Sequence, residues 1–356
     1  MRHLRAIRCL TIGLAVSLLP RPVPAEPAPS YELISIVDSS DPLGTPMFGA
    51  INNRGTVAIR SRLRNGEQLI SLWEHGQIRP VVSVGLIGTL SNPDLNDLGE
   101  VSFMLEEFQA TPASLKVRDG RIVERVEEGD AFDLILCCPL INNRGDMTLF
   151  GVLDGIEGIY TVNRGKITTI ADTTGPFSYF GPATSINERG QVAFTADPDD
   201  PERAAVLLGD GKRTAVVVDA SGPFEFFTSG VVNDGGTAAA QAFPDGLIPS
   251  PSILIRDRHG LRVFVGPDGP FEFPERPLLN NAGLLVFTST LDGSFDRGVY
   301  TGPDPDADKV LGPGDPLAGS TVVGTAATGL NNAGEIVLYV ELADGRKGLW
   351  LAVLRR

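Results

Sequence analysis

An apolar residue followed by Asn-x-x-Gly and a short β-like run occurs seven times in this 356-residue chain, at a spacing of 44 to 51 residues. The asparagines are Asn52, Asn96, Asn142, Asn187, Asn233, Asn280 and Asn331. The motif has the chemistry of a turn, because Asn can bond the backbone of its own turn and Gly tolerates a positive φ. A fixed period of this length is typical of a propeller or a repeat array.

Each period resolves into four short segments bounded by Gly, Pro, Asn and Asp, which predicts four strands per repeat. In the fourth repeat the predicted strands cover residues 183–186, 191–195, 204–208 and 212–219. The last two are joined by Asp210-Gly211, a favoured hairpin turn.

The seventh repeat ends after its third strand, Gly348 to Leu354, and has no fourth strand. The segment from Tyr31 to Pro42 matches in phase the fourth-strand segments that start at Lys166 and Lys212. A closed ring uses such a split repeat to pair its ends and to remove exposed strand edges. We therefore predict an all-β fold, a seven-bladed β-propeller of four-stranded blades, closed by the N-terminal strand pairing with the last repeat.

The N-terminus has the pattern of a secretory signal peptide. Arg2, Arg5 and Arg8 precede an apolar stretch, and Val23-Pro24-Ala25 forms a cleavage-site-like end. We predict a signal peptide over residues 1–25 and one propeller domain over residues 26–356, exported to the periplasm or out of the cell. No later segment offers the ~20 apolar residues of a spanning helix, so we expect no membrane span or anchor.

The chain is acidic, with a formal net charge of −14. Removing residues 1–25 leaves 26 basic and 44 acidic residues, a charge of −18. Such a surface disfavours nucleic acid and anionic lipid as partners.

The repeats resemble a known family. The best copy, INERGQVAF from Ile186, has the core of the tandem NxxGxxAF repeats of secreted bacterial proteins. The Gly-Asp-Pro segment at Gly312 and the Gly-aromatic strands at Gly158, Gly298 and Gly348 also match. The resemblance covers essentially the whole mature chain and implies a β-propeller-like protein of no established function. It implies no catalytic residue, since the shared positions are turn and core positions.

In a propeller blade the second-to-third loop and the fourth-to-first crossing lie on one face, where length variation is expected to set binding specificity. The crossings there carry six aromatic residues: Phe177, Tyr179, Phe224, Phe226, Phe271 and Phe273. They either form a stacking platform for a sugar or an apolar ligand, or pack between neighbouring blades. Their regular recurrence favours packing.

Cys137 and Cys138 are the only cysteines of the mature chain. They either form a vicinal disulfide or remain two buried thiols on opposite faces of a strand. The second interpretation is favoured, because neighbouring Cα atoms lie ~3.8 Å apart, below the usual ~4.4 Å minimum for a disulfide.

The sequence offers few residues suited to metal binding or to nucleophilic catalysis. His75 and His259 fall in third-to-fourth hairpins and are interpreted as turn residues. Asp304, Asp306 and Asp308 alternate as in a calcium loop, but Lys309 replaces the turn glycine, which favours a solvated hairpin. Acids for paired-carboxylate hydrolysis would come from the long-loop face: Glu106, Glu107, Asp197, Asp199, Asp200, Asp245, Asp292 and Asp296.

These observations favour a secreted, non-catalytic binding or interaction scaffold whose partner is a protein or a glycan, with no cofactor predicted. Two alternatives stay open. One is a propeller hydrolase or lyase acting on a glycan, which would need two converging carboxylates in a pocket at the central channel. The other is a calcium-stabilised surface or adhesion module.

Overall fold

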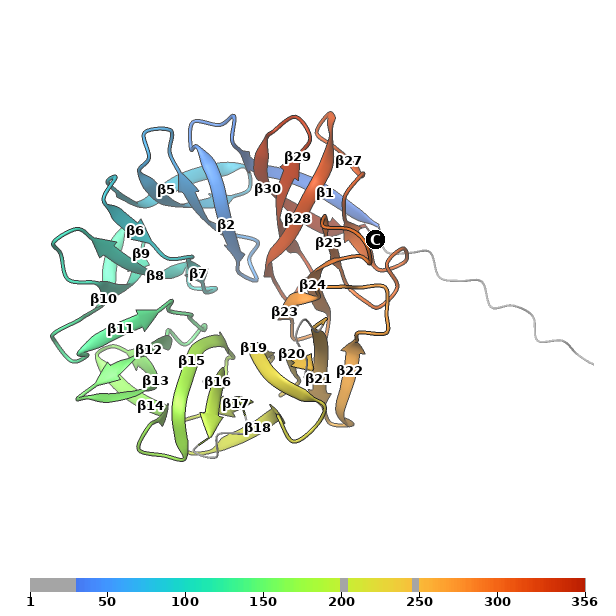
Figure 1. The fold of residues 1–356 in the computed structure, drawn as a ribbon. Helices are drawn as coiled ribbons and strands as arrows, with labels where there is room; N and C mark the ends of the chain where they lie inside the picture. The colour runs from blue at the N-terminus through green and yellow to red at the C-terminus, as the bar shows by residue number, and fades with distance from the viewer. Residues whose placement is uncertain (1–29, 199–203, 245–249, 356) are drawn as a thin grey trace, which may run out of the picture.

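The computed structural model describes residues 30–198, 204–244 and 250–355. These residues form seven antiparallel sheets arranged around a central axis, as Figure 1 shows, and contain no helix. The prediction of an all-β, seven-bladed propeller is confirmed. The predicted signal peptide, residues 1–25, lies outside the described residues and stays a prediction.

Each blade runs from an inner strand at the axis to an outer strand at the rim. Blade 1 contains β2 (Thr45–Ile51), β3 (Val57–Arg62), β4 (Gln68–Glu74) and β5 (Gln77–Val84). In blade 2 the inner position is shared by β6 (Gly88–Leu90) and β7 (Asp94–Leu95), followed by β8 (Glu100–Glu107), β9 (Ala113–Arg118) and β10 (Arg121–Glu127). Blade 3 contains β11 (Leu134–Cys137), β12 (Met147–Leu153), β13 (Ile156–Asn163) and β14 (Lys166–Asp172).

Blades 4 to 6 repeat this order. Blade 4 contains β15 (Phe177–Ile186), β16 (Val192–Pro198), β17 (Ala205–Gly209) and β18 (Thr214–Asp219). Blade 5 contains β19 (Phe224–Val232), β20 (Ala238–Pro244), β21 (Ser252–Asp257) and β22 (Gly260–Val265). Blade 6 contains β23 (Glu275–Leu279), β24 (Leu285–Thr290), β25 (Arg297–Tyr300) and β26 (Lys309–Leu311).

Blade 7 closes the ring as predicted. It contains β28 (Ser320–Leu330), β29 (Ile336–Leu342), β30 (Lys347–Leu354) and, from the other end of the chain, β1 (Tyr31–Asp38); the short β27 (Pro316–Leu317) adds to β28. The register of β1 against β30 runs from Tyr31 opposite Leu354 to Asp38 opposite Gly348. The pairing leaves β30 without a free edge.

The core consists of apolar clusters that lie between neighbouring blades. At the blade 7–blade 1 interface, for example, Val37 of β1 is 1% exposed and shares a cluster with Leu349 of blade 7 and with Ile59 and Trp73 of blade 1. Each blade is therefore stabilised mainly by its two neighbours, at about 25 cal/mol per Å² of apolar surface buried.

Strand direction sorts the connections onto two faces. The Asn-x-x-Gly turns and the third-to-fourth hairpins lie on one side, here called the turn face. The second-to-third loops and the crossings between blades lie on the other side, here called the loop face. In the Asn-x-x-Gly turns, the glycines have φ between 76° and 86°, the left-handed region that glycine tolerates best.

The seven motif asparagines link the blades into a closed ring of hydrogen bonds on the turn face. Each Oδ1 accepts the backbone N–H four residues on, at 2.9 to 3.0 Å, as the motif predicts. Each Nδ2 donates to the carbonyl oxygen of the corresponding Asn in the next blade, at 3.0 to 3.1 Å. The last of these bonds joins Asn331 to Asn52 and closes the ring. All seven side chains are buried.

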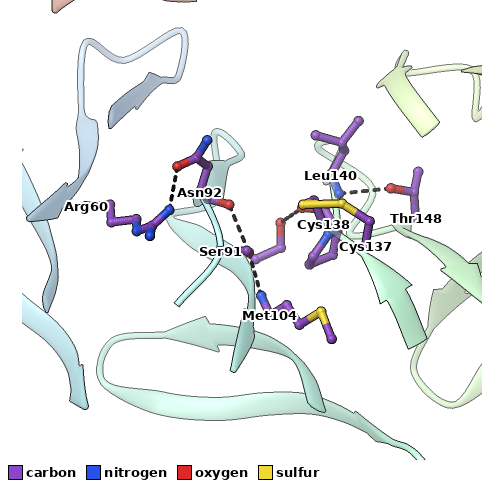
Figure 2. The surroundings of a disulfide bond; sticks show 10 residues. Arg60, Ser91, Asn92, Met104, Cys137, Cys138, Leu140 and Thr148 are labelled. Carbon is purple, nitrogen blue, oxygen red and sulfur yellow. Dashed lines mark hydrogen bonds between the residues drawn. A yellow bond between two sulfur atoms is a disulfide. The ribbon is translucent and has the colours of Figure 1, made fainter. Parts of the chain in front are cut away.

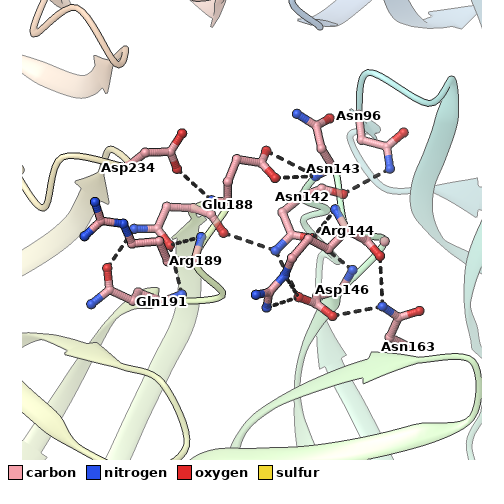
Figure 3. A network of polar contacts seen from close by, with 12 residues as sticks. Asn96, Asn142, Asn143, Arg144, Asp146, Asn163, Glu188, Arg189, Gln191 and Asp234 are labelled. Carbon is pink, nitrogen blue, oxygen red and sulfur yellow. Dashed lines mark hydrogen bonds and ion pairs between the residues drawn. The ribbon is translucent and has the colours of Figure 1, made fainter.

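A second ring is formed by the residues that follow these asparagines. The backbone N–H of each donates to the side-chain oxygen of its counterpart in the next blade, at 2.6 to 2.9 Å. The members are Asn53, Asp97, Asn143, Glu188, Asp234, Asn281 and Asn332. Figure 3 shows the part of both rings between Asn96 and Asp234. Every member carries a side-chain oxygen, and this regularity in the sequence would have pointed to the second ring.

A buried ion pair adds a further link between blades 2 and 3. Lys116 Nζ lies 2.6 Å from Glu124 Oε2, and both side chains are about 5% exposed or less. The ammonium also donates to the Gly145 carbonyl, and the carboxylate accepts the N–H groups of Arg164 and Gly165 in blade 3. Burial by itself would raise the pKa of Glu124, but the hydrogen bonds from Lys116 and blade 3 outweigh it and lower this pKa.

Candidate functional site

The central channel narrows at the turn face to a polar space of about 200 Å³ bounded by the two rings. Three carboxylates, those of Asp97, Glu188 and Asp234, belong to this end, and each accepts a backbone N–H of the preceding blade. Burial and the nearby charges of Asp234 and Asp97 raise the pKa of Glu188. The carboxylates thus serve as links between blades.

At the loop face the channel opens into a mainly apolar pocket of about 420 Å³, lined by residues from all seven blades. Asp94 is the acidic residue among its lining residues. Both carboxylate oxygens of Asp94 accept backbone N–H groups, from Leu95 at 2.9 Å and from Ile141 at 2.8 Å. Burial raises the pKa of Asp94 despite these two bonds. A second carboxylate, which a paired-carboxylate hydrolase would need, is not among the described residues that line this pocket.

The acids proposed for such chemistry lie elsewhere. Glu106, Glu107, Asp197, Asp292 and Asp296 do not line the channel pocket. Asp199, Asp200 and Asp245 lie outside the described residues.

Cys137 and Cys138 form a vicinal disulfide at the channel mouth, shown in Figure 2. The favoured prediction of two buried thiols on opposite faces of a strand was wrong. Strand β11 ends at Cys137, after a register shift that follows Ile135, so Cys138 lies beyond the strand, where it is exposed and lines the channel pocket. The alternation of side chains in a strand therefore does not separate the two sulfur atoms.

The six predicted loop-face aromatics divide into two sets, which the sequence did not separate. Phe177 and Phe224 are half-buried against the clusters of blades 4 and 5. Phe271 is fully buried, with its ring centroid 4.7 Å from that of Tyr300. For these three, the prediction of packing is confirmed.

The other three rings, Tyr179, Phe226 and Phe273, are exposed on successive blades. In a regular strand, residues two apart share one environment. Register shifts between Phe177 and Tyr179, and between Phe224 and Phe226, break this alternation. The inner strand β15 begins at Phe177, six residues before the predicted start, and β19 begins at Phe224, so Tyr179 and Phe226 belong to inner strands. Phe273 precedes β23 and lies in the crossing, as predicted.

Within the described ranges, all exposed aromatic side chains lie on the loop face. They are Phe108, Tyr179, Phe226, Phe273 and Phe295. The apolar side chains exposed beside them at this face are Met47, Leu86, Ile87, Leu134, Leu136 and Val323. In the turns that form the opposite face, Leu98 is the one large apolar side chain that is exposed among the described residues. Exposed apolar side chains gathered on one side of a soluble protein are typical of an interaction surface.

A cavity of about 1060 Å³ also lies on the loop face. It is formed between blades 4 and 5 by β15, β16, the start of β17, the β18–β19 crossing and β19. Its wall contains two of the exposed rings, Tyr179 and Phe226, and two acidic residues, Asp197 and Glu225.

The remaining candidates are turn residues. His75, with φ of 48°, and His259 occupy hairpins and are exposed, which confirms their interpretation as turn residues. Asp304 Oδ1 accepts the N–H groups of Asp306 and Ala307, and Asp308 Oδ2 accepts the N–H of Asp304. No group of three or more His, Cys, Asp or Glu residues suited to a metal ion occurs within the described ranges. The Asp304 hairpin uses its acids to stabilise its own turn.

Comparison with known proteins supports the fold. No protein-family model and no curated protein matches the chain. Among solved structures, it is similar to an oligogalacturonate lyase from Vibrio parahaemolyticus (TM-score 0.56, 12% identity, 91% of this chain and 97% of that chain). It is also similar to the β-propeller domain of the Trilobed protease from Pyrococcus furiosus (0.53, 12%, 74% and 82%) and to a chain of a mitotic checkpoint complex (0.50, 12%, 96% and 99%).

At 12% identity these similarities show the fold alone, which is shared by enzymes and by components of assemblies. The resemblance to NxxGxxAF-repeat proteins stays a prediction. No helix in the described part of the chain has the length and apolar content needed to cross a membrane.

Proposed function

We propose that this protein is an exported, non-catalytic scaffold that binds a partner through its loop face. The observation that carries the proposal is the placement of all exposed aromatic rings on that face, on blades 2, 4, 5 and 6. Aromatic side chains supply large contact areas at low cost in conformational entropy and are enriched at the centres of interfaces. On the mainly polar turn face, the described side chains link the blades, and none of the exposed ones there is aromatic.

The acidic residues of the chain support binding more than hydrolysis. In the channel, Asp94 and the three carboxylates of the second ring accept backbone N–H groups of neighbouring blades. These four carboxylates therefore have a structural role in joining the blades. The loop-face acids are spread over several blades.

The proposal is tested with a loop-face variant, Phe108→Ser, Phe273→Ser and Phe295→Ser, in mature protein comprising residues 26–356. The matched control, Ile122→Ser, Val216→Ser and Val263→Ser, removes three exposed apolar side chains from the outer strands. Both variants are first compared with the wild type by thermal unfolding, and we expect little change because all six side chains are exposed.

Immobilised wild-type and variant proteins are then used to recover partners from periplasmic and culture-fluid fractions, and are screened by thermal shift against neutral and acidic oligosaccharides. We expect wild type and control to retain the same ligand and the loop-face variant to lose it. Equal retention by the loop-face variant would contradict the proposal, as would turnover of an oligosaccharide by the wild type.

A further inference from the structure

The cavity between blades 4 and 5 combines two features that point to one kind of ligand. The first is a pair of exposed aromatic rings. Tyr179 is 58% exposed and Phe226 is 56% exposed, and both line the cavity. The Phe226 ring is packed against Phe243 with centroids 5.8 Å apart. This contact supports the ring from one side while more than half of the side chain stays accessible.

The second feature is negative charge that no described lining residue compensates. Asp197 and Glu225 line the same cavity, and neither carboxylate has a hydrogen bond or ion pair with another described residue. The described lining residues include no Lys, Arg or His; the others are Gly, Pro, Ala, Thr and Phe. This distinguishes the cavity from the channel, where each carboxylate described above is bonded to a neighbouring blade.

Aromatic faces and carboxylates both attract cations. A cation placed over an aromatic ring is stabilised by the ring quadrupole, and a guanidinium or ammonium group next to a carboxylate gains a charge-assisted hydrogen bond. A neutral sugar could stack on the rings, but such stacking makes no use of two carboxylates that have no partner among the described residues. An anionic ligand would be repelled by them.

We infer that the cavity between blades 4 and 5 binds a cationic side chain, Arg or Lys, presented by a segment of a partner polypeptide. The inference rests on the proposed function and specifies the partner's chemistry: a basic residue flanked by apolar residues that contact the surrounding loop face. Arg fits best, because its planar guanidinium can stack on a ring and bond a carboxylate at the same time. The acidic protein as a whole, with a net charge of −14, also favours a basic partner.

The test uses the mature chain and four pools of soluble nonapeptides with Arg, Lys, Gln or Glu at the central position and random flanking residues. Retention of each pool on immobilised protein is measured at low and at physiological ionic strength. We expect retention of the Arg and Lys pools at least about tenfold above the Gln and Glu pools, falling as salt rises.

Isosteric variants then locate the binding. Asp197→Asn and Glu225→Gln are each expected to reduce retention of the Arg pool severalfold, and Phe226→Leu to reduce it while keeping the contact with Phe243 largely filled. Glu107→Gln, an exposed acid on blade 2 of the same face, is the matched control and is expected to change nothing. Thermal unfolding of each variant verifies that the fold is retained.

The outcomes separate this inference from the proposed function. Equal retention of the Gln pool, no effect of the carboxylate variants, or binding of neutral oligosaccharides that Glu225→Gln leaves unchanged would overturn the inference. If such binding is still lost in the loop-face variant, the scaffold proposal stands. If any binding is unchanged in the loop-face variant as well as in the carboxylate variants, both are overturned.

Discussion

At the scale of single residues, the motif asparagines have two roles, and only one could be derived from the sequence. Asn-x-x-Gly predicts a side chain that bonds its own turn, which the structure confirms. The donation from Nδ2 to the next blade depends on how the blades pack, and one turn considered alone gives no information about its neighbour. The invariant Asn at seven positions, where Asp would stabilise a turn equally well, was the available signal for a required donor.

The substitution Asn233→Asp tests this second role. Asp keeps the oxygen that accepts the Thr237 N–H but replaces the donor to the Asn280 carbonyl with a carboxylate oxygen, in a buried position. We expect the free energy of unfolding to fall by about 3 kcal/mol near neutral pH, measured by urea denaturation, because a charged group is buried against an acceptor. Asn65→Asp, at an exposed turn where Oδ1 accepts the Glu67 N–H, is the control and should cost less than about 0.5 kcal/mol.

The cysteine pair gives a second prediction at the residue scale. In mature protein denatured without reductant, iodoacetamide should modify no cysteine; after reduction it should modify Cys137 and Cys138. Because the bond closes a loop between adjacent residues, it constrains the unfolded chain little, and replacing both cysteines with Ser should change the free energy of unfolding by less than about 1 kcal/mol. Modification before reduction, observed by mass spectrometry of exported protein, would contradict the disulfide.

At the scale of elements, the repeat pattern predicted strand number and order but not strand irregularities. The boundaries of the predicted fourth-repeat strands lie within three residues of the observed ones, except that β15 extends back to Phe177. The residues added to β15 include the register shift that turns Tyr179 outward. A bulge is decided by the fit of two paired strands, so the pattern of one strand could not reveal which aromatics are exposed.

Strand β1 offers a direct test of ring closure. Val37, 1% exposed, packs between blades 7 and 1, whereas Ile34 on the same strand is 37% exposed. We expect Val37→Asp to lower the free energy of unfolding by at least about 3 kcal/mol, because it buries an unpaired charge at the seam, and Ile34→Asp to change it by less than about 0.5 kcal/mol. Equal effects of the two substitutions in urea denaturation would indicate that β1 does not close the ring.

At the scale of the whole molecule, the two faces of the propeller have different roles. Side chains of the turn face hold the blades to one another, and those of the loop face leave apolar and acidic surface accessible. The sequence correctly assigned the variable loops to one face. The sequence could not show which of these loops form a binding surface. The exposure of a ring and the pairing of a carboxylate depend on side chains from separate blades.

Links between blades also predict how stability depends on pH. The pKa of Glu124 is lowered in the folded protein, so its contribution is present above its unfolded pKa of about 4.3 and is lost as the pH falls through the folded value. Glu124→Gln leaves the Lys116 ammonium buried without its partner and should cost about 3 to 5 kcal/mol at pH 7. The difference from wild type should shrink as the pH is lowered from 5 towards 3.

The control for this prediction is Glu341→Gln, which breaks the more exposed pair between Glu341 and Lys347. It should cost about 1 kcal/mol or less at pH 7. A gap between wild type and Glu124→Gln that stays constant from pH 7 to pH 3, measured by urea denaturation, would contradict the role assigned to Glu124.

The ring of asparagines has one further consequence, for how such a protein can change in evolution. Every blade gives one amide hydrogen bond to its successor and receives one from its predecessor, always in the same direction around the axis. Duplication or loss of one whole repeat would therefore leave no donor and no acceptor without a partner, as in any head-to-tail assembly that closes on itself. The pattern of hydrogen bonds is compatible with any number of blades. The number seven must therefore be determined by the packing between neighbouring sheets.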